Sequence, residues 1–192
     1  MTRSADHAID PSFLRRFSPR AMSGAPLPRG ELLRLFEAAR WAPSSANGQP
    51  WRFVVGELGT PAFDGLFGVL DEWNRSWCVR AAALVLVCAD TVRVTSKGER
   101  VPRRLATFDA GAAWMSLALQ GSQMGLVVHA MEGFDHVGVR AVVGAPDGVE
   151  ALAMVAIGLP GDAQALPEKY RGGEAPSGRE PQSTRVFFGR LG

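Results

Sequence analysis

Residues 81–89 form an almost uninterrupted apolar run, and this run restricts the fold more than any other feature of the chain. It has no polar face of the kind that a surface helix carries, and it is far shorter than the roughly 20 residues of a membrane span. A strand buried on both faces is the structure that suits such a run. Residues 126–131 and 151–159 predict two further strands of the same kind, and residues 52–55 predict a short one.

Segments with helical periodicity separate the predicted strands. Apolar residues recur at three- and four-residue intervals within residues 30–41, and again after Thr60 and Pro61, which are typical of an N-cap and a first helical residue. Asp109 can cap a long helix over residues 110–125 that is apolar on most of its circumference and is therefore expected to be covered all round. Asp135 can cap a short helix that ends at Gly144. The alternation indicates an α/β or α+β fold with a mostly covered sheet.

Length and composition exclude several classes of protein. With 192 residues and a 46% apolar share, we expect residues 1–192 to form a single domain with its own core. A formal charge of +2 argues against a nucleic-acid partner, which would require a basic stripe. The N-terminus lacks the apolar core of a signal peptide, so we expect a cytoplasmic protein without a membrane partner. The histidines lack metal-ligand spacing, so no metal is expected, and Cys78 and Cys88 predict buried free thiols.

The two ends of the chain differ in character from its centre. We expect residues 1–12 to be flexible. Residues 160–178 are rich in proline and glycine, which predicts irregular structure, yet the apolar residues Val186, Phe187 and Phe188 follow them. Exposed apolar residues of this kind are a liability for a soluble protein. We therefore expect residues 160–192 to be an arm that docks, either on the body of its own chain or on a second subunit.

Residues 15–20 predict a receptor for a phosphate group. In an extended segment alternate side chains share a face, so Arg16, Ser18 and Arg20 project together. Two guanidinium groups and one hydroxyl suit a phosphate dianion. The alternative is a solvated basic arm, which these residues taken alone favour.

Two further segments carry polar or permissive residues where ligands often bind. Between Pro43 and Pro50, small polar and amide side chains can hydrogen-bond a ring edge or a sugar chain, although an ordinary helix-to-strand loop has the same composition. Residues 131–135 follow a predicted strand, at the kind of position where α/β folds bind ligands. Gly133 would allow a backbone N–H to approach a flat ligand. Phosphate-loop, dinucleotide-fold and nucleophile-elbow motifs are absent from the sequence.

Taken in this order, the three segments resemble the FMN-dependent nitroreductase family over residues 15 to about 181. The most specific match is residues 38–53, Ala-Ala-Arg-Trp-Ala-Pro-Ser-Ser-Ala-Asn-Gly-Gln-Pro-Trp-Arg-Phe. The resemblance implies an α+β (α/β-like) fold with a mixed, largely antiparallel sheet sandwiched by helices. It also implies an intertwined homodimer with an extended C-terminal arm, in which the helix that opens at residues 109–113 forms the dimer core.

The resemblance also implies which residues contact FMN. Residues 16–20 would hold the phosphate and the ribityl chain, the loop after Pro43 would reach the flavin of the neighbouring subunit, and residues near 131–133 would offer a backbone N–H to flavin N5. The implied set is Arg16, Phe17, Ser18, Arg20, Pro43, Ser44, Ser45, Asn47, Asn74, Ala130, Met131, Glu132, Gly133 and Arg179. No side chain is an obvious proton donor, so no catalytic residue is predicted, and Glu132 is expected to position the nicotinamide or a water.

The implied activity is that of an FMN-dependent oxidoreductase using NADH or NADPH, with ping-pong hydride transfer through flavin N5 to a nitroaromatic, a quinone or an activated alkene. The alternatives are other flavin chemistry on the same fold (dehalogenation, dehydrogenation of a heterocycle or consumption of the flavin) and a non-catalytic FMN-binding module. Trp77 departs from the family, because many members carry a lysine there, near flavin N1 and O2. Either Arg20 supplies the positive charge that this lysine has in those relatives, or the reduction potential of the bound flavin is lower than in those relatives. The assignment depends on Arg16, Arg20 and Arg179 converging around one phosphate.

Overall fold

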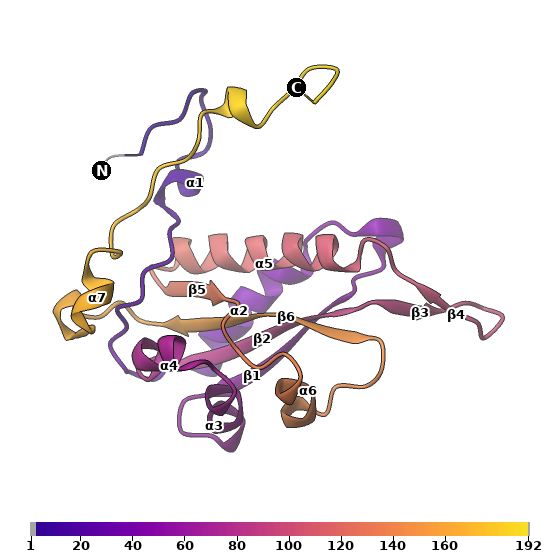
Figure 1. Cartoon of the computed structure of the whole chain (residues 1–192), viewed down its shortest axis with the longest axis horizontal. Helices are drawn as coiled ribbons and strands as arrows, with labels where there is room; N and C mark the ends of the chain where they lie inside the picture. The colour runs from indigo at the N-terminus through magenta and orange to yellow at the C-terminus, as the bar shows by residue number, and fades with distance from the viewer. Residues whose placement is uncertain (1–2, 192) are drawn as a thin grey trace.

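A four-stranded antiparallel sheet forms the centre of the computed structural model, which describes residues 3–191 (Figure 1). The strands are β1 (Trp51–Glu57), β2 (Ala83–Asp90), β5 (Val127–Met131) and β6 (Val149–Gly158), and their order in the sheet is β1-β2-β6-β5. Every neighbouring pair is antiparallel. The expected α+β class and the largely antiparallel character of the sheet are therefore confirmed, but the sheet is not mixed, since no parallel pair occurs among the described residues.

β2 is the buried strand that the apolar run predicts. Because side chains alternate across a strand, Val85 and Val87 pack into one core while Leu84 and Leu86 pack into the other. The strand is buried from Ala83 to Ala89. Both cysteines are buried free thiols, as predicted, and burial raises the pKa of Cys88 to about 11.

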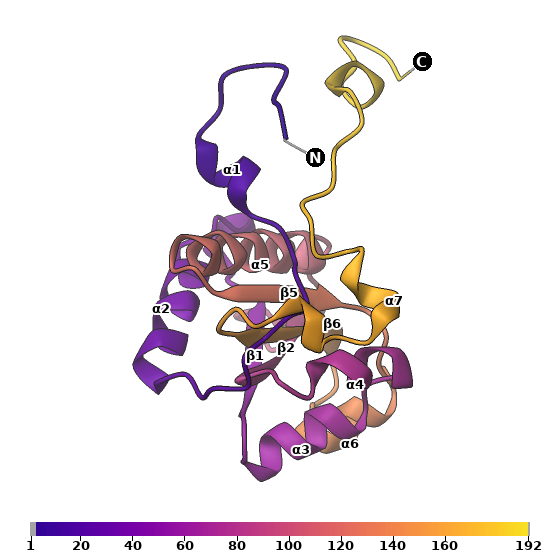
Figure 2. The same ribbon diagram turned by 90° about the vertical axis from the view of Figure 1, so that its left-hand side faces the viewer.

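Helices cover both faces of the sheet, as the resemblance implied (Figure 2). On one face lie α2 (Arg29–Arg40) and α5 (Ala106–Gln123), which pack Leu35 and Leu117 against the sheet. On the other face lie α3 (Pro61–Gly68), α4 (Glu72–Cys78) and α6 (Gly138–Val143), which contribute Leu66, Trp77 and Val139 to the core. No helix within residues 3–191 combines the length and the apolarity needed to cross a bilayer.

The capping assignments are partly wrong. Asp109 does not cap the long helix, because α5 begins three residues earlier at Ala106. Its buried carboxylate instead accepts the backbone N–H of Ser45 at 3.0 Å, so a tertiary contact uses it. Asp135 does act at the start of α6, where its Oδ1 accepts the N–H groups of Val137 and Gly138 at 3.0 and 2.9 Å.

Several short elements are not predicted from the sequence. They are α4 and the hairpin of β3 (Val92–Val94) and β4 (Arg100–Pro102). The segment 160–178 is less irregular than expected, because it contains η2 (Ala163–Ala165) and α7 (Glu168–Arg171). Tyr170 of α7 is buried, and its hydroxyl donates to the backbone carbonyl of Trp73 at 2.8 Å.

The two ends of the chain project from the body together (Figures 1 and 2). The N-terminal segment leads into α1 (Pro11–Arg15), and the C-terminal arm carries η3 (Gln182–Thr184). Arg3 Nε donates to the carbonyl of Ser177 at 2.8 Å, and the N–H of Gln182 donates to Asp6 at 3.2 Å. Residues 1, 2 and 192, which belong to the segments predicted to be flexible and to dock, lie outside the described residues.

The apolar end of the arm does not dock on the body of its own chain. Val186 and Phe187 are about half exposed and Phe188 is 99% exposed. Likewise, α5 is not covered all round, since Phe108 in its first turn is 74% exposed. This chain alone therefore leaves uncovered two apolar surfaces that were expected to be covered.

Candidate functional site

Arginines from opposite ends of the chain lie on neighbouring segments, because Arg3 donates from Nη1 to the carbonyl of Arg16 at 2.6 Å and from Nε to the carbonyl of Ser177, two residues before Arg179. Burial lowers the pKa of Arg16, and the positive charges of Arg3 and Arg179 lower it further. Arg16 Nη1 donates to Ser18 Oγ at 3.3 Å, so this hydroxyl lies on the same side as the guanidinium. Among residues 3–191, no carboxylate forms an ion pair with these three arginines. Clustered cations without a carboxylate partner make an anion-binding surface.

Arg20 lies in a different environment from Arg16 and Arg179. Its guanidinium carbon is 5.8 Å from the Trp77 ring centroid and 5.5 Å from that of Tyr170, which are cation–π distances. Its Nε is buried without a hydrogen-bond partner. An unsatisfied buried donor costs about 1–3 kcal/mol. Arg16 and Arg179 therefore lie on neighbouring segments, whereas Arg20 presents an unsatisfied donor beside an aromatic pair, and the binding of one phosphate by all three arginines stays a prediction.

Asn74 connects helix α4 to the end of strand β5. The carboxylate of Asp71 accepts the Asn74 backbone N–H at 2.7 Å and so caps the helix. The Asn74 side chain then donates from Nδ2 to the carbonyl of Gly133 at 3.1 Å and accepts from Trp77 Nε1 at 3.2 Å. An amide side chain has two N–H groups and two lone pairs, so one donor and one acceptor position remain for a ligand.

The end of β5 joins this network. Ala130 is half-buried, Met131 is buried, and Glu132 is exposed beside a cavity of about 630 Å³ that Gly133 also lines. His129 Nδ1 donates to the carbonyl of Pro19 at 3.0 Å, which fixes residues 16–20 against the sheet. Burial lowers the pKa of His129, so the neutral imidazole is favoured.

The loop between α2 and β1 is held in a strained conformation. Ala46, Asn47 and Gln49 have φ values of 50°, 51° and 43°, in the left-handed region that L-residues rarely adopt. The loop contains η1 (Ser45–Asn47) and is fixed by the bond from Ser45 to Asp109 and by one from Gln49 N–H to Ser44 Oγ at 3.0 Å.

Helix α5 separates this loop from the other predicted site residues. Ser45 contacts the first turn of α5, while Phe17 lines a cavity together with Ser122 in its last turn. At 1.5 Å per residue, an 18-residue helix is about 27 Å long. The structure therefore divides the predicted residues into three groups. Arg16, Ser18 and Arg179 lie where the N-terminal segment runs beside the arm, and Arg20, Asn74, Ala130, Met131, Glu132 and Gly133 lie around α4 and the end of β5. Phe17, between Arg16 and Ser18 in the sequence, lies beside the last turn of α5, and Pro43, Ser44, Ser45 and Asn47 lie near its first turn.

Three residues of this region are not predicted from the sequence. Arg3 joins the arginine cluster, Tyr170 packs against Arg20, and Asp71 caps the helix that carries Asn74. Tyr170 is the single tyrosine of the chain and stands in a tail otherwise rich in proline and glycine, which is the one signal that could have identified it.

Comparisons with known proteins identify the family and the fold. Residues 14–58 and 61–159 match the model of the nitroreductase family. An NADH dehydrogenase of Thermus thermophilus is 30% identical over 177 residues, which cover 78% of this chain and 85% of that protein. A crystal structure described as an oxidoreductase containing FMN is 38% identical with a TM-score of 0.96, covering 99% of this chain and 96% of that one. A nitroreductase family protein of Streptococcus pneumoniae, 18% identical with a TM-score of 0.73, covers 92% of this chain and 98% of its own and shares the fold.

Proposed function

The chain belongs to the nitroreductase family, and from this premise we propose that it is an FMN-dependent oxidoreductase that takes electrons from NADH or NADPH. The observation that carries the proposal is that Arg3 bonds the backbone of both Arg16 and Ser177, so that Arg16 and Arg179 lie on neighbouring segments, and that none of the three forms an ion pair within residues 3–191. Two relatives support the proposal: one solved structure is of an oxidoreductase containing FMN, and one sequence relative is an NADH dehydrogenase.

The residues present fit FMN. Arg16, Ser18 and Arg179 would bind the phosphate, because charged donors and a hydroxyl are the partners that a phosphate dianion requires. The unsatisfied Nε of Arg20 would donate to a polar edge of the ring system, in the role that the lysine has in relatives that lack Trp77. Phe17, Ala130 and Met131 would line the cofactor with mainly apolar surface, and Asn74 and Gly133 would offer polar groups.

The cofactor would supply the redox chemistry, a two-electron transfer from NAD(P)H to an organic acceptor. The protein holds, orients and shields it. We propose nitroaromatics, quinones or activated alkenes as acceptors. The acceptor would bind at the same place as the nicotinamide, after the oxidised nucleotide has left. Glu132 is exposed at this place and would position the nicotinamide or a water, and we assign no side chain to proton transfer.

Two copies of the chain are needed to complete the proposed site. The loop of Pro43, Ser44, Ser45 and Asn47 lies near the opposite end of α5 from Arg20 in its own chain, so only a second copy can bring such a loop to the flavin. The uncovered apolar face of α5 at Phe108 and the exposed end of the arm are the surfaces that such a homodimer would bury.

We expect the purified protein to bind FMN and to reduce it with NADH or NADPH. In anaerobic solution the flavin absorbance should bleach on addition of either nucleotide and return on addition of a quinone or a nitroaromatic. Free FMN with the same nucleotide is the control. A protein that takes up no FMN would contradict the proposal, and a bound flavin that NAD(P)H does not reduce would indicate a binding module without catalysis.

We expect replacement of Val186, Phe187 and Phe188 by serine to weaken the dimer. Light scattering should give the wild type twice the chain mass of 20.5 kDa. The dissociation constant of the triple-variant dimer should be at least about tenfold higher than that of the wild type. A tenfold change corresponds to about 1.4 kcal/mol, and burial of one such apolar side chain contributes more than this. Val94→Ser removes an exposed valine from the hairpin and should leave the mass unchanged. A wild type of single-chain mass would refute the dimer.

A further inference from the structure

The most basic segment of the molecule lies outside the site described above. Residues 92–104, which form the β3–β4 hairpin and its exit, contain five lysines and arginines and one glutamate, for a net charge of 5 − 1 = +4. The whole chain carries +2, so the rest of it carries 2 − 4 = −2. The positive charge is thus concentrated on one hairpin.

A cavity of about 760 Å³ lies between this hairpin, the loop of residues 43–50 and the first turn of α5. Arg93, Arg103 and Arg104 line it. Among its lining residues Asp109 is the one acid, and its carboxylate already accepts the Ser45 N–H. Three cations therefore line this cavity against one carboxylate.

The three arginines differ in their partners. Arg103 donates from Nη1 to the carbonyl of Gly48 at 3.1 Å, while its Nε is buried without a partner. Arg93 and Arg104 are exposed, and within residues 3–191 neither forms an ion pair. The guanidinium groups of Arg93 and Arg104 and the Nε of Arg103 therefore line the cavity without an ion-pair partner or a satisfying acceptor among the described residues.

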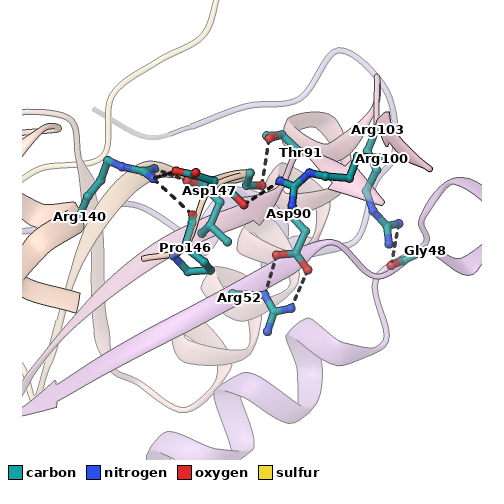
Figure 3. Close-up of polar contacts among 11 residues, drawn as sticks. Gly48, Arg52, Asp90, Thr91, Arg100, Arg103, Arg140, Pro146 and Asp147 are labelled. Atoms are coloured by element: carbon teal, nitrogen blue, oxygen red, sulfur yellow. Dashed lines mark hydrogen bonds and ion pairs between the residues drawn. The ribbon is translucent and has the colours of Figure 1, made fainter. Parts of the chain in front are cut away.

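Neighbouring arginines outside the cavity are engaged elsewhere (Figure 3). Arg52 forms a two-bond pair with Asp90 at 2.7 and 2.8 Å. Arg100 leaves the hairpin in another direction from Arg103 and donates to the carbonyl of Asp147 at 3.2 Å. Three of the five cations of residues 92–104 line the cavity, and Arg100, whose side chain lies outside it, provides a matched control on the same hairpin.

We propose that this cavity is a subsite for the phosphorylated adenosine end of the nicotinamide nucleotide, and that it selects NADPH through the 2′-phosphate. Three guanidinium groups suit a phosphate dianion, and Pro50, Pro102 and Leu105 provide apolar walls for a planar base. The volume falls within the roughly 300–1,000 Å³ of small-molecule sites. Ser45 belongs both to the cavity and to the loop proposed to approach the flavin, so a nucleotide held here can extend toward it. The identification of the nucleotide as the electron donor rests on the proposed function.

The test measures nucleotide binding directly, by calorimetry on the FMN-loaded protein. Adenosine 2′,5′-bisphosphate should bind at least tenfold tighter than adenosine 5′-monophosphate. The double variant Arg93→Gln/Arg104→Gln should lose at least tenfold in affinity for the bisphosphate, while Arg100→Gln should stay within twofold of wild type. The FMN content should be the same in all three proteins.

Equal affinity for the two nucleotides, or an unchanged affinity in the double variant, would overturn the subsite. Inorganic phosphate binding as tightly as the bisphosphate, or a DNA duplex binding more tightly, would also overturn it. The proposed function fails separately: a protein that binds the bisphosphate but takes up no FMN would refute the flavin enzyme and leave the phosphate subsite standing.

Discussion

Replacing Arg16 and Arg179 together by glutamine is expected to weaken FMN binding by at least roughly a hundredfold. A hydrogen bond to a charged group contributes about 1.5–3 kcal/mol, so the loss of two costs about 3–6 kcal/mol. Since about 1.4 kcal/mol corresponds to a factor of ten, the dissociation constant should rise by roughly 10²–10⁴. Titration of the apoprotein with FMN, followed by the quenching of flavin fluorescence, measures the change.

Two controls separate phosphate binding from a structural effect. Arg15→Gln removes an exposed arginine next to Arg16 and should leave FMN affinity unchanged. Riboflavin lacks the phosphate, so its affinity should be nearly the same in the double variant and in wild type. If the double variant loses affinity for FMN and for riboflavin to the same extent, the arginines support the fold and do not bind the phosphate.

The electrostatics of the free protein give a further criterion. The positive charges of Arg3 and Arg179 lower the pKa of Arg16, so the three cations repel one another when no anion is bound. Removing two of them should therefore leave the melting temperature of the apoprotein unchanged or higher. Binding sites often lower the stability of the protein when their ligand is absent. A higher melting temperature in the double variant would therefore support a binding role for these arginines over a structural one.

The central strands and longest helices could be predicted because their signals are local. The apolar run at 81–89 leaves few alternatives to a buried strand, and β2 occupies most of it. Helix α4 and the β3–β4 hairpin were missed for the opposite reason. Helix α4 has seven residues and the hairpin strands have three each, too few to establish a period.

Asp109 shows where local rules fail. An acidic residue near the start of a helix can cap it or can lie in its first turn, and both are common. The alternative realised here depends on Ser45, whose N–H the carboxylate accepts. No local pattern contains that contact.

The candidate site was predicted as a set of residues but not as an arrangement. Arg16 and Arg179 lie on neighbouring segments because the arm returns beside the N-terminal segment, while Ser45 lies at the first turn of α5 and Phe17 beside its last. Both relations depend on topology, which a pattern of residue types does not encode. Tyr170 could have been noticed as the single tyrosine of the chain, but its contact with Arg20 could not be predicted, because the four-residue helix that carries it is too short to show a period.

Gly133→Ala is expected to lower the free energy of unfolding by about 1–3 kcal/mol and to weaken FMN binding. A Cβ at this position would lie 2.0 Å from Asp71 Oδ2 and 2.5 Å from Asn74 Nδ2. Asp71 caps α4 and Asn74 bonds the Gly133 carbonyl, so relieving the clash sacrifices a cap of about 1 kcal/mol and a hydrogen bond of about 0.5–1.5 kcal/mol. Urea unfolding measures the first effect and FMN titration the second.

Space, not backbone conformation, makes this glycine necessary, since the φ of Gly133 is not among the left-handed values of the chain. Gly30→Ala is the matched control: a Cβ there meets nothing within 4 Å, and alanine in a helix should raise stability by up to about 1 kcal/mol. If Gly133→Ala unfolds like wild type but still loses FMN, the glycine is needed for the close approach of the ligand. If the variant loses stability and keeps its affinity for FMN, the hydrogen bond from Asn74 to the Gly133 carbonyl supports only the fold, and Asn74 has no part in positioning the flavin.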